Sequence, residues 1–156
     1  MRKFHFTFIL LLASLVMVSS CNKSKGCVPK TVASELATMQ AYATANGMTV
    51  QTHPSGMLYQ IVSPGNGPVP TLSSTVSVKY TGKLMNGTIF DSRTSSPISF
   101  GLSQVIQGWQ LGVPLIQKGG TIRLIVPSSL AYGCSAAGTV PADAVLFFEI
   151  QLLDVQ

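Results

Sequence analysis

From about residue 51 onward, the chain consists of short runs of β-branched and aromatic residues separated by Gly, Pro, Ser and Asn. Runs of this length, bounded by turn-forming residues, are typical of strands in an antiparallel sheet. In Val76-Ser77-Val78-Lys79-Tyr80 apolar and polar residues alternate, so one side of that strand should be buried and the other solvated. The predicted strands are residues 58–62, 75–81, 89–90, 121–126 and 145–153.

Two other segments indicate helices. Within residues 31–45 apolar side chains recur at steps of three and four residues, and Asn46-Gly47 follows as a natural helix end. A helix this short is marginal alone, so it should dock on the domain, which is the simpler arrangement, or on a second copy. Residues 104–114 form the second candidate, which would cover one face of the sheet. The predicted fold class is therefore α+β, with an antiparallel sheet, one short wrapped helix and a short N-terminal helix.

Residues 1–20 have the organisation of an export signal. Arg2 and Lys3 form a positive start, and residues 4–18 form a nearly continuous apolar stretch that is short for a membrane span. Two small residues, Ser19 and Ser20, follow. We expect this segment to be a signal peptide and not part of the fold.

The segment Val18-Ser19-Ser20-Cys21 resembles the lipobox of bacterial lipoproteins, in which the Cys thiol is acylated and becomes the mature N-terminus. The alternative is an ordinary thiol beside a plain cleavage site. Acylation predicts a protein of the cell envelope, anchored to a membrane by lipid and facing the periplasm. Asn22 in place of Asp slightly favours the outer membrane. Residues 21–30 are then a tether, residues 31–50 a short helical segment and residues 51–156 the main domain.

Composition excludes several classes of function. The formal net charge of +5 falls to +3 after residue 20, from eight Lys and Arg against five Asp and Glu. These charges are scattered, which argues against a nucleic-acid partner. The two His residues are His5, within the signal, and His53, and no Cys-x-x-Cys occurs. The sequence therefore offers neither a metal site nor a thiol redox motif.

If Cys21 is acylated, the remaining cysteines are Cys27 and Cys134. The oxidising conditions that exported proteins meet would permit a disulfide between them. Their separation along the sequence does not reveal their distance in the fold. A disulfide, two free thiols and mixed partners therefore all stay open.

Five motifs, in order and in register over about residues 56–155, resemble the FKBP-type peptidyl-prolyl cis/trans isomerases. They are V-K-Y-T-G at 78–82, G-T-I-F-D-S at 87–92, Q-V-I-Q-G-W at 104–109, A-Y-G at 131–133 and V-L-F-F-E-I-Q-L-L at 145–153. The resemblance implies a twisted antiparallel sheet curved around one short helix, with an apolar pocket between them. It also implies proline-containing polypeptides as substrates, macrolides of the rapamycin type as inhibitors, and no metal or cofactor.

The resemblance also implies roles for ten residues. Trp109 matches the pocket floor and Asp91 the carboxylate at the rim, while the Ile106 N–H and the Tyr132 hydroxyl match donors to substrate carbonyls. The residues matching the catalytic pocket are Tyr80, Phe90, Asp91, Trp109, Tyr132 and Phe148. Those matching further substrate contacts are Ile98, Val105, Ile106 and Val140.

Each role has a plainer alternative. Aromatic residues of a small sheet, such as Trp109 and Phe148, are usually core residues, and an Asp before Ser is often a turn residue. The sequence also departs from the family pattern. Ile98 stands where an aromatic residue is common, and the loop after Gly133 lacks its usual bulky segment, which leaves Val140 as the matching apolar contact. These departures leave substrate preference and macrolide affinity open.

Overall fold

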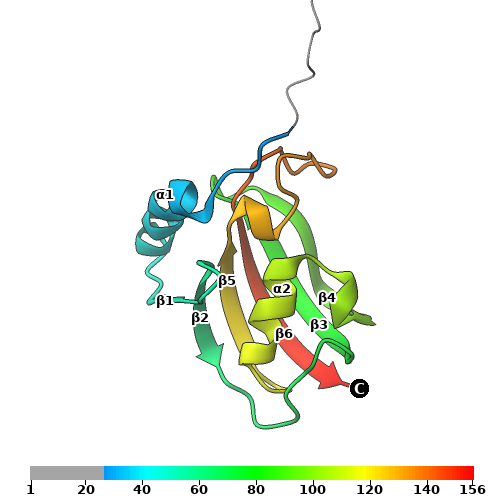
Figure 1. Ribbon diagram of the computed structural model, residues 1–156. Helices are drawn as coiled ribbons and strands as arrows, with labels where there is room; N and C mark the ends of the chain where they lie inside the picture. Colours follow the sequence, from blue (N-terminus) through cyan, green and yellow to red (C-terminus); the bar gives the residue numbers. More distant parts are fainter. Residues whose placement is uncertain (1–26) are drawn as a thin grey trace, which may run out of the picture.

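The computed structural model describes residues 27–156, so the predictions for the signal, for Cys21 and for most of the tether lie outside the described residues. Figure 1 shows the helices and strands along the chain. They are the helix α1 (Val32–Ala45), the strands β1 (Gln51–Thr52), β2 (Leu58–Ser63), β3 (Thr75–Leu84) and β4 (Ile89–Gly101), the 3₁₀ helix η1 (Leu102–Gln104), the helix α2 (Gln107–Gly112), the 3₁₀ helix η2 (Val113–Leu115), the strand β5 (Thr121–Val126), the 3₁₀ helix η3 (Ser128–Leu130) and the strand β6 (Leu146–Val155).

The strands form a six-stranded sheet in the order β1-β2-β5-β6-β3-β4, with every neighbouring pair antiparallel. The long strand β6 lies inside the sheet, where Phe148 is paired with both Leu124 of β5 and Gly82 of β3. Figure 1 shows the sheet curving around α2. The predicted α+β fold, with one short helix against the sheet and a helix at the N-terminal side, is confirmed.

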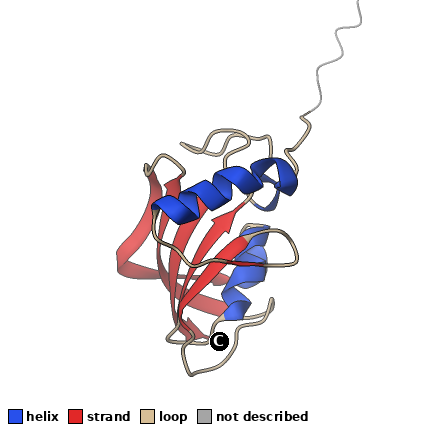
Figure 2. Ribbon diagram, turned by 90° about the vertical axis from the view of Figure 1, so that its left-hand side faces the viewer, coloured by secondary structure: helices blue, strands red, loops and turns tan. Residues whose placement is uncertain are grey.

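Alternation along the strands divides the core between the two faces. Leu124 and Phe148 pack in the cluster beneath α2, whereas their chain neighbours Ile125 and Phe147 pack in the cluster beneath α1. This is the period-two pattern of a sheet that is buried on both sides. Figure 2 shows α1 crossing the face of the sheet opposite to α2.

The helix α2 approaches the sheet closely because it carries glycines on the contact side. A Cβ atom at Gly108 would lie 2.4 Å from the Val126 side chain, and one at Gly112 would lie 2.6 Å from Leu124. Any other residue at these positions would push the helix away from β5. The glycines therefore set the depth at which Trp109, the residue after Gly108, enters the core.

The helix α1 docks on the domain itself. Thr31 caps its first turn by accepting a hydrogen bond from the Ser34 N–H. Met39 is fully buried, and the Tyr42 ring packs against Phe147 with 5.3 Å between ring centroids. Of the two arrangements that the sequence left open, the structure shows docking on the domain.

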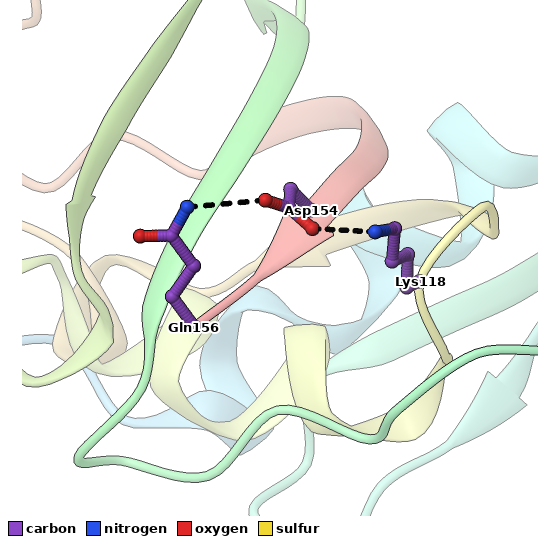
Figure 3. Close-up of polar contacts among 3 residues, drawn as sticks. All are labelled: Lys118, Asp154 and Gln156. Atoms are coloured by element: carbon purple, nitrogen blue, oxygen red, sulfur yellow. Dashed lines mark hydrogen bonds and ion pairs between the residues drawn. The ribbon is translucent and has the colours of Figure 1, made fainter.

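A polar contact joins the end of β6 to the turn before β5. The Asp154 carboxylate accepts from the Lys118 ammonium at 2.6 Å and from the Gln156 side-chain amide at 3.2 Å (Figure 3). The bond from Lys118 is the main cause that lowers the pKa of Asp154, followed by the bond from Gln156. Exposed pairs of this kind stabilise a fold little, so the contact mainly orients the C-terminal end of β6.

The largest differences between the predicted and the observed elements lie at three places, apart from shifts of one to three residues at strand ends. The strand predicted at 89–90 extends to Gly101, because residues 94–97, which resemble a turn, bulge out opposite Lys79 and the pairing with β3 then resumes. The helix predicted at 104–114 is α-helical only over Gln107–Gly112, because Val105 and Ile106 are extended. The two-residue strand β1 was not predicted, since two residues carry no periodicity.

Candidate functional site

A pocket of about 330 Å³ lies between α2 and the curved sheet. This size falls at the lower end of the range for small-molecule sites. Nine of the ten residues singled out in the sequence line it. The complete wall consists of Tyr80, Phe90, Asp91, Ile98, Phe100, Gln104, Val105, Ile106, Trp109, Tyr132 and Phe148.

Three aromatic rings surround Trp109 at the floor of the pocket. The indole is only 5% exposed. Tyr80 and Phe148 meet it edge to face, with centroid distances of 5.1 and 5.3 Å, and Phe100 is tilted against it at 5.7 Å. Such pairs add stability beyond their buried area, so the floor is a rigid apolar surface. The Trp109 indole nitrogen has no hydrogen-bond partner within residues 27–156.

The wall beside the floor depends on a glycine. A Cβ atom at Gly82 would lie 2.7 Å from the Phe90 ring and 3.0 Å from the Phe148 ring. These two rings pack edge to face with 5.6 Å between centroids. The sequence V-K-Y-T-G therefore supplies the space in which the two phenylalanines form one side of the pocket.

At the rim, the Tyr80 hydroxyl donates to Asp91 Oδ2 at 2.5 Å. Burial is the main cause that raises the pKa of Tyr80 to about 12, and the hydrogen bond to Asp91 and its charge add to the effect. The Arg93 guanidinium opposes these causes. The Tyr80 phenol is therefore neutral over the physiological pH range, and its hydroxyl donates its hydrogen bond to Asp91.

The extended segment Val105–Ile106 forms the edge of the pocket before α2. The Gln110 side-chain amide donates to the Val105 carbonyl at 2.8 Å and to the Ser103 carbonyl at 3.3 Å, which fixes the segment against the helix. Among residues 27–156, the Ile106 N–H donates to no other backbone carbonyl. Its geometry leaves this donor free for a ligand.

Tyr132 reaches the pocket from the opposite side and is 41% exposed. Two residues further on, Cys134 forms a disulfide with Cys27, with 5.7 Å between the Cα atoms. The pairing that the sequence left open is thus a disulfide in the structure. It joins the start of the described chain to the loop that carries Tyr132.

The residues that line the pocket differ from the predicted ones at three positions. Val140 lies in the core at 4% exposure, in a bridge with Ala137, and does not line the pocket. The loop after Gly133 turns it inward, since Ala137 and Val140 pair with each other. Phe100 and Gln104 line the pocket but were not singled out. The spacing of two between Ile98 and Phe100 could have placed both on one face.

Residues 27–156 contain no group of three or more His, Cys, Asp or Glu side chains arranged to hold a metal ion. No helix in the same range is long and apolar enough to cross a membrane.

Proteins of known family are similar to this chain in sequence. The family model for FKBP-type peptidyl-prolyl cis-trans isomerases matches residues 67–153. A probable FKBP-type peptidyl-prolyl cis-trans isomerase of Haemophilus influenzae is 43% identical over 114 residues, which cover 71% of this chain and 47% of that protein. FkpA of Escherichia coli K12, also described as an FKBP-type isomerase, is 42% identical over 69% of this chain and 40% of its own length. The chain spans less than half the length of these two relatives.

Solved structures share the fold as well. The crystal structure of FkpA from Escherichia coli superimposes with a TM-score of 0.72 at 38% identity, over 80% of this chain and 61% of that chain. A peptidyl-prolyl cis-trans isomerase from Pseudomonas syringae pv. tomato superimposes with a TM-score of 0.68 at 31% identity, over 83% of this chain and 98% of that chain. The chain is therefore similar to these two isomerases in both sequence and fold.

Proposed function

The chain belongs to the family of FKBP-type peptidyl-prolyl cis-trans isomerases, and from this membership we propose that it accelerates rotation of X-Pro bonds in exported or envelope proteins and so assists their folding. The observation that carries the proposal is the apolar pocket with Trp109 at its floor and Asp91 and Tyr132 at its rim. Proline-containing polypeptides are the proposed substrates.

An apolar pocket suits this reaction. The X-Pro amide is planar by resonance, and rotation costs about 18–20 kcal/mol, so uncatalysed exchange takes roughly tens to hundreds of seconds. In the twisted transition state the resonance is lost and the amide is less charge-separated. Walls of aromatic and aliphatic side chains stabilise this less polar state better than water does. The reaction requires no nucleophile, metal or cofactor.

The residues of the pocket divide this work. The Trp109 face receives the proline ring and restrains one end of the bond, with Phe90 and Phe148 beside it. The Ile106 N–H and the Tyr132 hydroxyl donate to substrate carbonyls while the residue before proline swings. Tyr80 and Asp91 hold each other at the rim, so that Asp91 presents a fixed carboxylate.

The remaining residues of the pocket wall contact the substrate through apolar surface and donate no hydrogen bond to it. Ile98, which is 37% exposed, and Val105 offer apolar area to the residue before proline. The same surface is the proposed binding site of macrolides of the rapamycin type. Val140 belongs to the core cluster, so we propose that it supports the loop and does not contact the substrate.

The exported setting rests on separate observations. Residues 1–20 have the pattern of an export signal and Cys21 that of a lipidation site, which would anchor the protein to a membrane. The Cys27–Cys134 disulfide supports an oxidising compartment, since cytosolic thiols are kept reduced. A lipoprotein that faces the periplasm, with the outer membrane slightly favoured by Asn22, fits both.

A peptide assay tests the activity. A short Leu-Pro peptide, cleaved by a protease only in the trans form, should lose its slow cis phase in proportion to added protein, and rapamycin should restore it. Binding of the peptide with no acceleration would instead favour a binding module of the same fold. Mass spectrometry of Cys21 tests the anchor, because an unmodified thiol in the native protein would contradict lipidation.

A further inference from the structure

The segment 128–134, which places Tyr132 at the pocket, contains little regular structure, although Leu130 packs in the core and the Gly133 carbonyl accepts from the Asp143 N–H. It begins with the single turn of η3 (Ser128–Leu130) and then leaves regular structure. Tyr132 is 41% exposed, so packing of its ring alone does not fix the position of its hydroxyl. The direction of the Tyr132 hydroxyl therefore depends on the contacts that hold the backbone before and after Tyr132.

Two contacts from the N-terminal part of the chain hold this segment. Before Tyr132, the Glu35 carboxylate of α1 accepts from the Ser128 N–H at 2.9 Å, a buried contact. After it, Cys134 is bonded to Cys27. Glu35 and Cys27 lie outside residues 67–153, the part that matches the family model. The family domain alone thus lacks both partners.

Glu35 is an unusual residue to find buried. It is only 3% exposed, and Ser128 is fully buried. A carboxylate taken out of water at such a depth is costly unless hydrogen bonds compensate it. Its only hydrogen-bond partner within residues 27–156 is the Ser128 N–H, while its Oε1 has none. If α1 only covered the sheet, an apolar residue would suit this position better. The hydrogen bond between Glu35 and the Ser128 N–H therefore points to a role in holding the segment 128–134.

Hydrogen bonds connect Ser128 to the residues on either side of Tyr132. The Ser128 carbonyl accepts from the Ala131 N–H at 3.0 Å and from the Gly133 N–H at 2.8 Å, on either side of Tyr132. The other end of the brace is firm, because α1 is capped by Thr31 and anchored by the fully buried Met39. The position of α1 on the sheet is therefore coupled to the position of Tyr132.

We propose that Glu35 and Cys27 are positioning residues for the isomerase reaction, which together brace the segment 128–134 so that the Tyr132 hydroxyl faces the bound X-Pro carbonyl. The catalytic part of this inference rests on the proposed function. The brace itself is a property of the fold and can be measured without turnover.

Hydrogen exchange of the full chain, purified with its disulfide intact, measures the brace directly. Glu35→Ala removes the acceptor, whereas Glu35→Gln keeps a side-chain oxygen for the Ser128 N–H. Faster exchange in the segment 128–134 of Glu35→Ala, with β6 unchanged and near-normal protection in Glu35→Gln, is expected. Thr44→Ala is the matched control, because it changes an exposed residue of the same helix, whose hydroxyl donates to the Gln40 carbonyl, and it should leave the segment protected. Unchanged protection in folded Glu35→Ala would overturn the brace.

Kinetics then measures its effect on the reaction. We expect Glu35→Ala to lower kcat/KM for a Leu-Pro peptide by about tenfold, mainly through kcat, as misplacement of a donor does. In that background Tyr132→Phe should cause no further loss, because the hydroxyl is already misplaced. Independent, additive losses would show that Glu35 acts only through general stability and would overturn the positioning role.

The disulfide provides a second variant should Glu35→Ala fail to fold. The double substitution Cys27→Ser/Cys134→Ser leaves the buried Glu35 side chain in place and should also lower kcat/KM, again without an additional effect of Tyr132→Phe. Wild-type activity in this folded variant would remove Cys27 from the brace. A folded wild-type chain that leaves X-Pro exchange unaltered would refute the proposed function, while the exchange experiment would still decide the brace.

Discussion

Tyr80 on β3 and Asp91 on β4 are joined side chain to side chain across the rim of the pocket, with the phenol as donor and the carboxylate as acceptor. The same phenol packs edge to face on Trp109 at the floor. One residue therefore connects the polar rim to the apolar base. Because the bond requires a neutral phenol, the rim should keep its geometry until strongly alkaline pH.

This contact predicts a specific dependence of stability on pH. The pKa of Tyr80 rises from 10.0 to about 12 on folding, so the native state holds its proton more tightly than the unfolded state. The stabilisation is fully present below pH 10 and is lost as pH rises from about 10 to 12. Urea unfolding at several alkaline pH values should show a steeper loss for wild type than for Tyr80→Phe. Parallel curves for the two proteins would contradict the shift.

Tyr132→Phe separates chemistry from fold, because it removes one donor and keeps the ring. A lost hydrogen bond of about 0.5–1.5 kcal/mol corresponds to a roughly two- to tenfold fall in kcat/KM. Asp91→Ala should also reduce activity, since it frees the Tyr80 hydroxyl. Thermal unfolding of both variants serves as the control for fold. A folded variant with wild-type activity would exclude that side chain from the mechanism.

Gly82→Ala tests the shape of the pocket. The added methyl group would meet Phe90 and Phe148 at 2.7 and 3.0 Å, so at least one ring must move into the pocket. Overpacking of this kind costs about 1–3 kcal/mol in the free energy of unfolding. We expect lower stability in denaturant and a raised KM for Leu-Pro peptides. An unchanged KM would mean that these rings do not contact the substrate.

The wall near the rim predicts substrate preference. Ile98 and Phe90 offer apolar area, worth about 25 cal/mol per Å² when a side chain covers it, and Asp91 places a negative charge beside them. Peptides with Leu or Phe before Pro should therefore be turned over faster than those with Glu. Equal kcat/KM values for Leu-Pro and Glu-Pro peptides would contradict this preference.

Much of the fold could be predicted because the local signals agree with the tertiary structure. Alternation in residues 76–80 follows burial closely, since Val76 and Val78 are fully buried. The signal failed where tertiary contacts override composition. Residues 94–97 resemble a turn in composition, yet they form a bulge inside the long strand β4. The extended Val105–Ile106 interrupts what periodicity alone predicts as one helix.

The pocket was predictable through motifs, and its support was not. Tyr80, Asp91 and Trp109 belong to segments whose order is specific. Gln104 opens the motif at 104–109 but received no role, and Phe100 lies outside the motifs. The partners of the segment 128–134 could not be fixed from the sequence, which left the Cys27–Cys134 disulfide as one of several alternatives and carried no signal for Glu35. Glu35 is 93 residues from Ser128, and Cys27 is 107 residues from Cys134. Only the docking of α1 brings these groups together.

The most direct test of the central claim is observation of the X-Pro bond itself. Exchange spectroscopy by NMR on a Leu-Pro peptide, without any protease, measures the rates between its cis and trans signals. With catalytic amounts of the folded chain, both rates should rise in proportion to protein concentration while the cis fraction stays constant, and the Tyr132→Phe variant should give a smaller slope. Exchange rates equal to those of the free peptide, at protein concentrations where binding is visible, would contradict the proposed isomerase function.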